Sequence, residues 1–90
     1  MSDRISLPEQ LNSAAVPGLR RMLAAAPKGA TLDGTGLRAV GGLAAQVLLD
    51  HVLRARRAGA NPKVLTSPEM AADLRLLGLE TWLNVEGAAA

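Results

Sequence analysis

The sequence predicts a single α/β domain with a mainly parallel sheet, packed with about three to four helices. Short apolar runs of strand character alternate with amphipathic segments of helical period. This order favours parallel strands joined by right-handed crossovers. Hydrophobic residues make up 49% of the 90 residues, with one Trp and no Phe or Tyr, so we expect an aliphatic core. We assign residues 1–90 to one domain, with a core from about 4 to 85.

The first strand and the first helix follow from short local signals. Residues 4–7, RISL, form a strand candidate that Pro8 ends. Asn12 or Ser13 can cap the next helix, and Pro17 falls in its first turn. We expect this helix to run to about Ala26 and to bury one apolar stripe, formed by Val16, Leu19, Met22 and Leu23.

The central stretch, residues 31–57, is predicted to be a strand, a Gly-rich loop and the longest helix. The strand covers residues 30–33 and ends at Asp33. Gly34 and Gly36 are expected to adopt backbone conformations that other residues avoid. Residues 37–40 are predicted to be a short extended link. The helix should begin around Gly41-Gly42 and end near Ala58, where Gly59 and Pro62 stop it.

The last third repeats the strand–helix order. Residues 63–66, KVLT, form a strand candidate, and Ser67-Pro68 is a helix start. That helix is expected to reach Leu77 and end at Gly78, with three residues facing inward, namely Met70, Leu74 and Leu77. Residues 79–85 are either a last short strand or a helical turn packed on the core.

Composition excludes several classes of function. The chain has no Cys, so disulfides and Cys-based metal sites are excluded, and one His gives metal binding no second ligand. Its formal charge is +2, with basic residues near the end of the longest helix, where cations complement the helix dipole. Without Tyr or Phe there is no stacking platform, so we expect no nucleic acid as partner. No secretory signal or membrane-length apolar run is visible, so we expect a cytoplasmic protein that does not insert into a membrane.

Catalysis and cofactor binding have little support in the sequence. His51 lies mid-helix without a positioned partner or nucleophile, so we predict no enzyme and no catalytic residue. The run from Gly34 to Gly42 suggests a phosphate loop but lacks the Gly-Lys-Ser/Thr ending, so we predict no cofactor. The alternative is that these glycines simply permit tight turns. Asp33 either accepts hydrogen bonds from the loop that follows or contributes to an acidic phosphorylation site that lacks a second carboxylate.

The longest helix carries the clearest functional signal. At 100° per residue its inward stripe consists of Ala45, Leu48, Val52 and Ala55. The opposite side carries Gln46, Asp50, Arg54 and Arg57. Leu43 and Val47 fall on this polar side, and two exposed aliphatic residues rimmed by charge suggest a protein-docking patch. The alternative is that the preceding loop folds over Leu43 and Val47.

Three segments, in this order, resemble the STAS domain, the fold of bacterial anti-sigma factor antagonists. The first is LPEQLNSAAVPGLRRML, similar to the family's second strand and first helix. The second is ATLDGTGLRAVGGLAAQVLLDHVLRARRAG, similar to its central strand, loop and second helix. The third is KVLTSPEMAADLRLLGLETWL, similar to its closing strand and helix. The resemblance runs from about Ile5 to Trp82. Most STAS domains have a further N-terminal strand, and its absence implies a sheet edge that a homodimer could pair.

The resemblance implies that the family's phosphorylation chemistry is missing. The family's loop has Asp-Ser-Ser/Thr-Gly before its second helix, and the first hydroxyl residue is phosphorylated by a partner kinase. The alignment places Gly41 at the Asp and Gly42 at the acceptor, so no phosphoacceptor is expected. Thr35 aligns with a different loop position. The segment VGGLAAQVLL also resembles short STAS proteins of alphaproteobacterial chemotaxis gene clusters, which carry Gly-Gly there.

We therefore expect a non-enzymatic STAS-domain signalling adaptor of bacterial type. Its partner would be a chemotaxis kinase or switch component, or an anti-sigma-type kinase. One alternative is a cytoplasmic STAS subunit of a lipid-transport ABC system, which uses the same helix to dock an ATPase. Another is a nucleotide- or small-ligand-binding module that uses the Gly-rich loop. The predicted partner-binding residues are Asp33, Thr35, Gly41, Gly42, Leu43, Gln46, Val47, Asp50 and Arg54.

Overall fold

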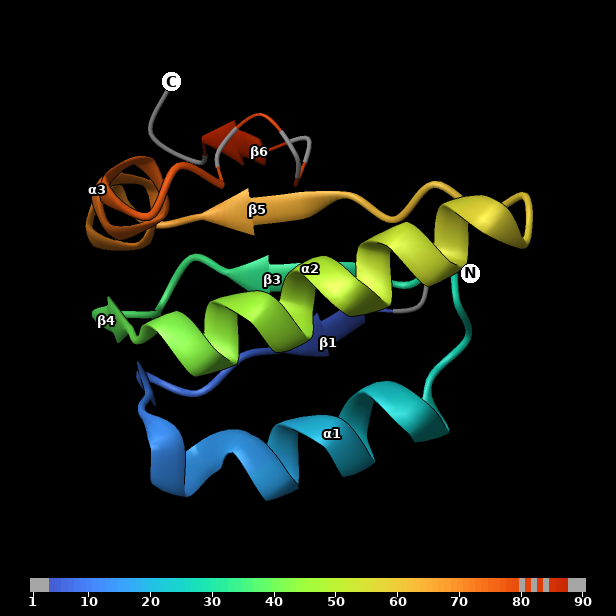
Figure 1. Cartoon of the computed structure of the whole chain (residues 1–90), viewed down its shortest axis with the longest axis horizontal. Helices are drawn as coiled ribbons and strands as arrows, with labels where there is room; N and C mark the ends of the chain where they lie inside the picture. The colour runs from blue at the N-terminus through green and yellow to red at the C-terminus, as the bar shows by residue number, and fades with distance from the viewer. Residues whose placement is uncertain (1–3, 80, 82, 84, 88–90) are drawn as a thin grey trace.

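The computed structural model describes residues 4–79, 81, 83 and 85–87, and its centre is a four-stranded parallel sheet (Figure 1). The strands lie in the order β1-β3-β5-β6. Ile5, Leu32, Val64 and Val85 share one register row. The strand bounds are β1 Arg4–Ser6, β3 Thr31–Gly34, β5 Val64–Thr66 and β6 Val85–Gly87. The α/β class and the parallel pairing predicted from the sequence are therefore confirmed.

A second, two-stranded sheet joins the predicted extended link, residues 37–40, to a segment before the first helix for which the sequence predicted no element. Strand β2 (Gln10–Leu11) pairs in parallel with β4 (Ala39–Val40). The strands of this sheet have two residues each, too few to show a period of two in the sequence. At the other end of the chain, β6 shares only Val85 with the segment 79–85 that was expected to be a strand or a helical turn. Before β6, Leu83 N donates to Leu79 O at 3.1 Å, a hydrogen bond of helical spacing, and Leu83 is fully buried, as expected for a helical turn packed on the core. The predicted resemblance ends at Trp82, which lies outside the described residues.

Three α-helices connect the strands. They are α1 (Val16–Ala25), α2 (Gly42–Arg57) and α3 (Pro68–Leu76), with a 3-10 turn over Ser13–Ala15 before α1. Ser67 caps the third helix as predicted, whereas Asn12 caps the 3-10 turn that precedes the first helix, whose own N-cap is Ala15 without a side-chain hydrogen bond. The Asn12 side chain accepts a hydrogen bond from Ala15 N, and Ser67 Oγ accepts one from Met70 N. Gly59 and Gly78 follow α2 and α3 with φ of 88° and 72°, which favour glycine after a helix end.

The aliphatic core lies between the sheet and the two long helices. In Figure 1, α2 crosses in front of the sheet, and α1 runs beside α2 and packs against it. Ile5, Leu32 and Val64 point from neighbouring strands into this core. The residues that alternate with them, such as Arg4 and Asp33, are exposed or half-buried on the opposite face of the sheet. The sheet therefore has one apolar and one more polar face.

Met22 and Leu77, which the sequence analysis predicted to face the core, lie at the surface. Met22 is 36% exposed, because it lies on the flank of α1 and not on the side that packs against the core. Leu77 is 42% exposed, because α3 ends at Leu76 and Leu77 is already the C-terminal cap. In the described part of the chain no helix is long and apolar enough to cross a membrane.

Gly34 and Gly36 do not have the unusual backbone conformation expected from the sequence. Positive φ angles among the described glycines occur only at Gly59 and Gly78. Gly34 is instead required by space, since a Cβ atom there would lie 2.3 Å from Met70 Sδ. At Gly36 an added Cβ would meet no atom within 4 Å.

Candidate functional site

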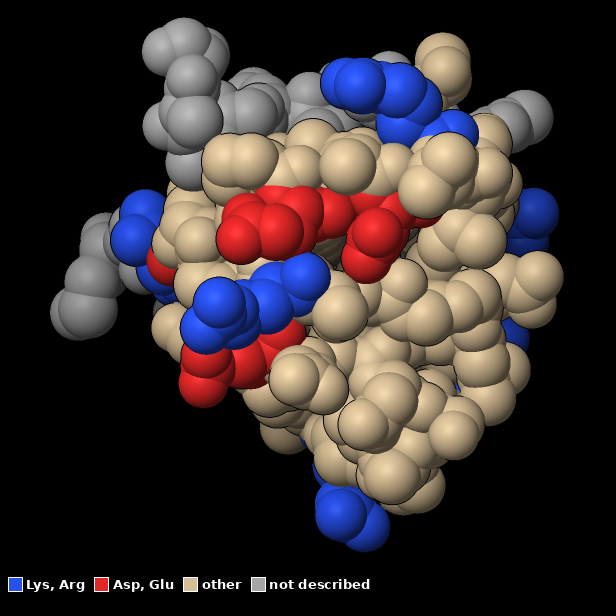
Figure 2. Space-filling model, turned by 90° about the vertical axis from the view of Figure 1, so that its left-hand side faces the viewer, with Lys and Arg blue, Asp and Glu red and all other residues tan. Residues whose placement is uncertain are grey.

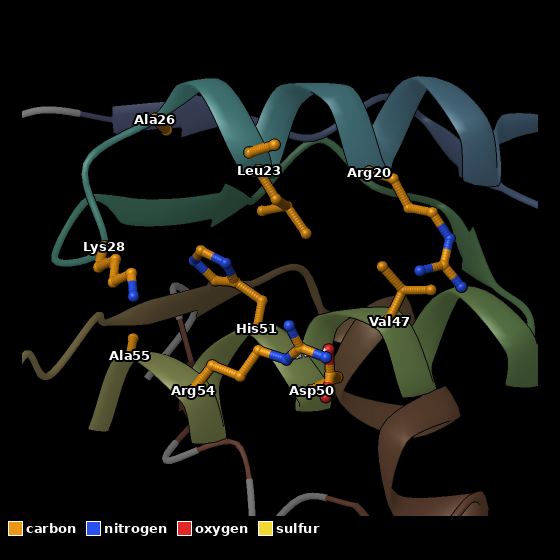
Figure 3. Close-up of a pocket in the computed structure, with 10 residues that line it drawn as sticks. Arg20, Leu23, Ala26, Lys28, Val47, Asp50, His51, Arg54 and Ala55 are labelled. Carbon is orange, nitrogen blue, oxygen red and sulfur yellow. Dashed lines mark ion pairs between the residues drawn. The ribbon is translucent and has the colours of Figure 1, made fainter. Parts of the chain in front are cut away.

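The candidate site is a groove between α1 and α2 that contains two adjoining hollows. The entrance hollow lies beside the start of α2, has a volume of about 210 Å³, and is lined by Arg20, Leu43, Gln46, Val47 and Asp50. The second hollow, the His51 pocket, has a volume of about 280 Å³ and lies beside the second half of α2 (Figure 3). Arg20, Val47 and Asp50 line both hollows, so the groove is continuous.

The inward side of α2 agrees with the helical period. All four residues of the predicted stripe are buried, namely Ala45, Leu48, Val52 and Ala55. Gln46, Asp50 and Arg54 are exposed on the other side, as predicted. Asp50 Oδ2 and Arg54 Nε form an ion pair at 2.9 Å, one helical turn apart. The face of α2 that is turned away from the core is therefore polar over this stretch.

The prediction that both Leu43 and Val47 face outward is wrong for Val47. Leu43 is 52% exposed, as expected, but Val47 is only 8% exposed. Val47 shares the wall of the His51 pocket with Leu23 and Arg20 of α1 (Figure 3). Helix α1 covers it, and not the loop before α2 that the alternative hypothesis invoked. A helical wheel alone does not show where a second helix packs, so the side of Val47 was assigned wrongly.

Gly41 and Gly42 form the entrance of α2 without a side-chain cap. Gly41 is the N-cap with φ −84° and ψ 166°, and its N–H donates to Leu11 O at 2.9 Å. An added Cβ at Gly42 would lie 3.9 Å from Leu77 Cδ2, an ordinary contact. Leu77 is partly exposed, so it adds apolar surface beside Gly42.

Asp33 and Thr35 belong to a different part of the molecule. Asp33 Oδ1 accepts hydrogen bonds from Thr35 N at 3.0 Å and from Thr35 Oγ1 at 2.7 Å, and Arg4 Nη1 lies 3.4 Å from Asp33 Oδ2. The Thr35 hydroxyl, then the Thr35 N–H and, more weakly, Arg4 lower the pKa of Asp33. Because the Asp33 side chain alternates with buried Leu32 and Gly34, it points to the face of the sheet opposite the core. Asp33 therefore accepts hydrogen bonds from its loop, the first of the two interpretations offered by the sequence.

His51 is half-buried in the wall of the pocket named after it. No described residue makes a hydrogen bond to its Nε2, although that atom is buried. Burial is the main cause that lowers the pKa of His51, the charge of Asp50 opposes this, and Lys28 adds to the lowering. Across the part of the chain that the structure describes, no three His, Cys, Asp or Glu side chains could hold a metal ion.

Arg20 and Lys28 are pocket residues that the sequence did not nominate. Arg20 lies on α1, and Lys28 lies in the turn between α1 and β3, as Figure 3 shows. The only sequence signal for Arg20 was its position off the apolar stripe of its helix. Such a position indicates the surface but does not identify the helix across from it.

The surface around the start of α2 is largely without charge. Figure 2 shows the end of the molecule where α2 begins, and residues other than Lys, Arg, Asp and Glu cover most of its right-hand side, below a band of acidic residues. The known proteins offer no guide to this surface, because no family model, curated protein or solved structure matches the chain. Function must therefore be inferred from the sequence and the groove.

Proposed function

We propose that the chain is a non-enzymatic, STAS-like signalling adaptor that binds a protein partner through the entrance hollow. The observation that carries this proposal is Leu43, which is 52% exposed in the wall of a hollow with a charged rim. Arg20 supplies a positive charge on one side, and Asp50 lies on the other. An apolar centre with a polar rim is the usual anatomy of a protein interface. Charges of both signs at the rim would set the orientation of the partner.

The STAS-like assignment is supported by the order of the elements and by the start of α2. In the proposed alignment, Asp33 is the last residue but one of the central strand, and Gly42 occupies the acceptor position at the first residue of α2. Glycine has no hydroxyl group, so the adaptor would act without phosphorylation at this position. Its partner would be a chemotaxis kinase or switch component, or an anti-sigma-type kinase, in the cytoplasm of a bacterium.

The proposal of a non-enzymatic role is supported by the isolation of His51. A general base must be oriented by a partner and must reach the proton it removes. Among the described residues nothing hydrogen-bonds to His51 Nε2, and the chain has no Cys to act as a nucleophile. Asp50, its neighbour in the sequence, is already paired with Arg54.

The test compares two Leu→Asp variants as baits in the native host. Leu43→Asp places a carboxylate in the entrance hollow. Leu76→Asp is the matched control, since Leu76 is 86% exposed on α3 and lines neither hollow. Proteins cross-linked to the wild type and to each variant are quantified by mass spectrometry. We expect a kinase or a chemotaxis component to be enriched with the wild type and with Leu76→Asp, and to be lost with Leu43→Asp.

Two outcomes would contradict the proposal. If both variants retain the same partners as the wild type, the entrance hollow is not the docking surface. If the protein that depends on Leu43 is the ATPase of a lipid transporter, the chain is a transporter subunit and not a signalling adaptor. Thermal unfolding of both variants shows whether each one is folded, so a lost partner cannot be confused with a lost structure.

A further inference from the structure

The His51 pocket has an apolar floor and a cationic wall. Leu23 of α1 and Val47 and Ala55 of α2 supply apolar surface, and all three are buried. Three basic side chains besides His51 line the pocket, namely Arg20, Lys28 and Arg54. Figure 3 shows Lys28 beside the imidazole of His51 at one end and Arg20 at the other. Apolar walls with a few convergent polar groups are typical of small-ligand sites.

The positive charge of this pocket is only partly compensated. Asp50 is the one carboxylate among the lining residues, and it is paired with Arg54 at 2.9 Å. In the described structure neither Arg20 nor Lys28 forms an ion pair. The buried Nε2 of His51 has no hydrogen-bond partner either. Uncompensated cations beside an imidazole favour an anion, because an anion would pair with the cations and stabilise the protonated imidazole.

We infer that the His51 pocket binds a small phosphate monoester, with the phosphate between Lys28 and His51 and the organic part against Leu23 and Val47. A phosphate monoester carries between one and two negative charges at neutral pH, and its second pKa is about 6. Lys28 supplies one positive charge at this end of the pocket, and a phosphate bound beside His51 would favour protonation of the imidazole, which would then supply a second. A carboxylate would balance only one of them. Arg20, at the far end, is left to contact the organic part.

This inference goes beyond the proposed adaptor function and does not depend on it. Leu43 lines the entrance hollow but not the His51 pocket, and Lys28 lines only the His51 pocket. A partner lost with Leu43→Asp therefore tests the adaptor, whereas a ligand lost with Lys28→Gln tests the pocket. Either result can be obtained without the other.

The experiment uses His51 as its own reporter. Because the chain has a single His, the imidazole gives one set of ¹H–¹³C signals in NMR. Phenyl phosphate is titrated into the labelled full chain at constant ionic strength, with sodium chloride as the reference salt. We expect a saturable shift of the His51 signals in the millimolar range and a higher pKa of His51 in the saturated complex. The charged groups around the imidazole are Asp50 and Arg54 on α2, Arg20 on α1 and Lys28 in the turn. These groups are the same with and without ligand, so a rise in the pKa of His51 is caused by the added anion.

Matched variants decide where the phosphate lies. Lys28→Gln should weaken phenyl phosphate binding by about tenfold, since a charged hydrogen bond is lost. Arg20→Gln should weaken it less. Arg57→Gln should leave phenyl phosphate binding unchanged. Arg57 is exposed on α2, the helix that carries His51, but it does not line the pocket. Inorganic phosphate should bind more weakly than the ester, since it lacks the apolar part.

Several results would overturn the inference. One is the absence of a saturable shift of the His51 NMR signals when phenyl phosphate is added to tens of millimolar. A second is equal binding by Lys28→Gln and wild type. A third is equal binding of inorganic phosphate and phenyl phosphate, which would remove the role of the apolar floor. Benzoate binding as tightly as phenyl phosphate would overturn the assignment to a phosphate.

Discussion

Gly34 lies directly against Met70, so close that a Cβ atom at residue 34 would be 2.3 Å from Met70 Sδ and 3.0 Å from Leu65 O. Met70 is fully buried, so its side chain would have to shift within the packed core to make room for an added Cβ atom. The last residue of β3 is therefore glycine because α3 packs over it. This contact fixes the separation between the central strand and the third helix.

Gly34→Ala should destabilise the fold by about 1–3 kcal/mol, because the core is overpacked. Gly36→Ala is the control, since it meets no atom within 4 Å and should be neutral or slightly stabilising. Chemical denaturation measures both. Met70→Ala should cost less free energy in the Gly34→Ala background than in the wild type. Equal cost in the two backgrounds would show that the two residues are not in contact.

Val47→Asp should be far more damaging than Leu43→Asp, although both residues lie on the same side of α2. Val47 is 8% exposed, so a carboxylate there would be buried, at a cost of about 3 kcal/mol. Leu43 is 52% exposed, so its substitution should change the free energy of unfolding by about 0.5 kcal/mol or less. Urea unfolding of the two variants decides the matter. Similar losses would mean that α1 does not cover Val47.

Asp33 should make the fold less stable in acid. Its pKa is lowered from 3.8 by the Thr35 hydroxyl, the Thr35 N–H and Arg4. A carboxyl group with a lower pKa in the folded state contributes stability above its unfolded pKa, and this contribution is lost as the pH falls through the folded value. Thr35→Val removes the strongest of these interactions, so the variant should lose less stability than the wild type below about pH 4. Identical pH profiles from denaturant unfolding would contradict this.

His51 should give a second pH dependence nearer to neutrality. Burial lowers its pKa from 6.5, so the unfolded chain binds a proton at a higher pH than the folded chain does. The stability that neutral His51 contributes is fully present above pH 6.5, the ordinary pKa of the unfolded chain's imidazole. It is lost as the pH falls from there through the lower pKa of His51 in the folded state. His51→Gln removes this titration. The thermal midpoint of the wild type should fall more between about pH 7 and pH 5 than that of the variant, and parallel curves would refute the effect.

Gly41→Ser should stabilise the domain by about 0.5–1 kcal/mol. Gly41 has φ −84° and ψ 166°, nearly the angles of Ser67, whose hydroxyl caps α3 at φ −74° and ψ 164°. A serine at 41 can therefore cap α2 in the same way, toward the N–H of Ala44. An added Cβ meets only Leu11 O, at 3.5 Å. Differential scanning calorimetry against wild type tests this, with a lowered midpoint as the contrary result.

The parts of the fold predicted correctly are those encoded by neighbouring residues. Caps such as Ser67, helix ends such as Gly59, and the buried stripe of α2 depend on spacing within one element. The pairing of β2 with β4 could not be predicted, because two residues per strand show no pattern. Gly34 was assigned a conformational role because its actual neighbour, Met70, is distant in the sequence.

The candidate site was predicted only in part, for the same reason. Leu43, Gln46, Asp50 and Arg54 were placed on the outer side of α2 by the helical period alone. Val47, Arg20 and Lys28 depend on how α1 lies against α2, which no pattern within either helix specifies. Asp33 and Thr35 were grouped with α2 because they are near it in the sequence, whereas strand alternation turns the Asp33 side chain to the other face of the sheet.

The open geometry of Gly41 and Gly42 also has a genetic consequence. Neither glycine has a positive φ, and a Cβ at either position meets only ordinary contacts. The glycine codons GGU and GGC differ by a single nucleotide from codons for aspartate and for serine, whereas GGA and GGG differ by one nucleotide from codons for glutamate but not for serine. A carboxylate at 41 is thus one point mutation away, and so is a hydroxyl at 42 where its codon is GGU or GGC, on a backbone that already accepts them. Chemistry could be gained or lost at this helix start without any change in the fold.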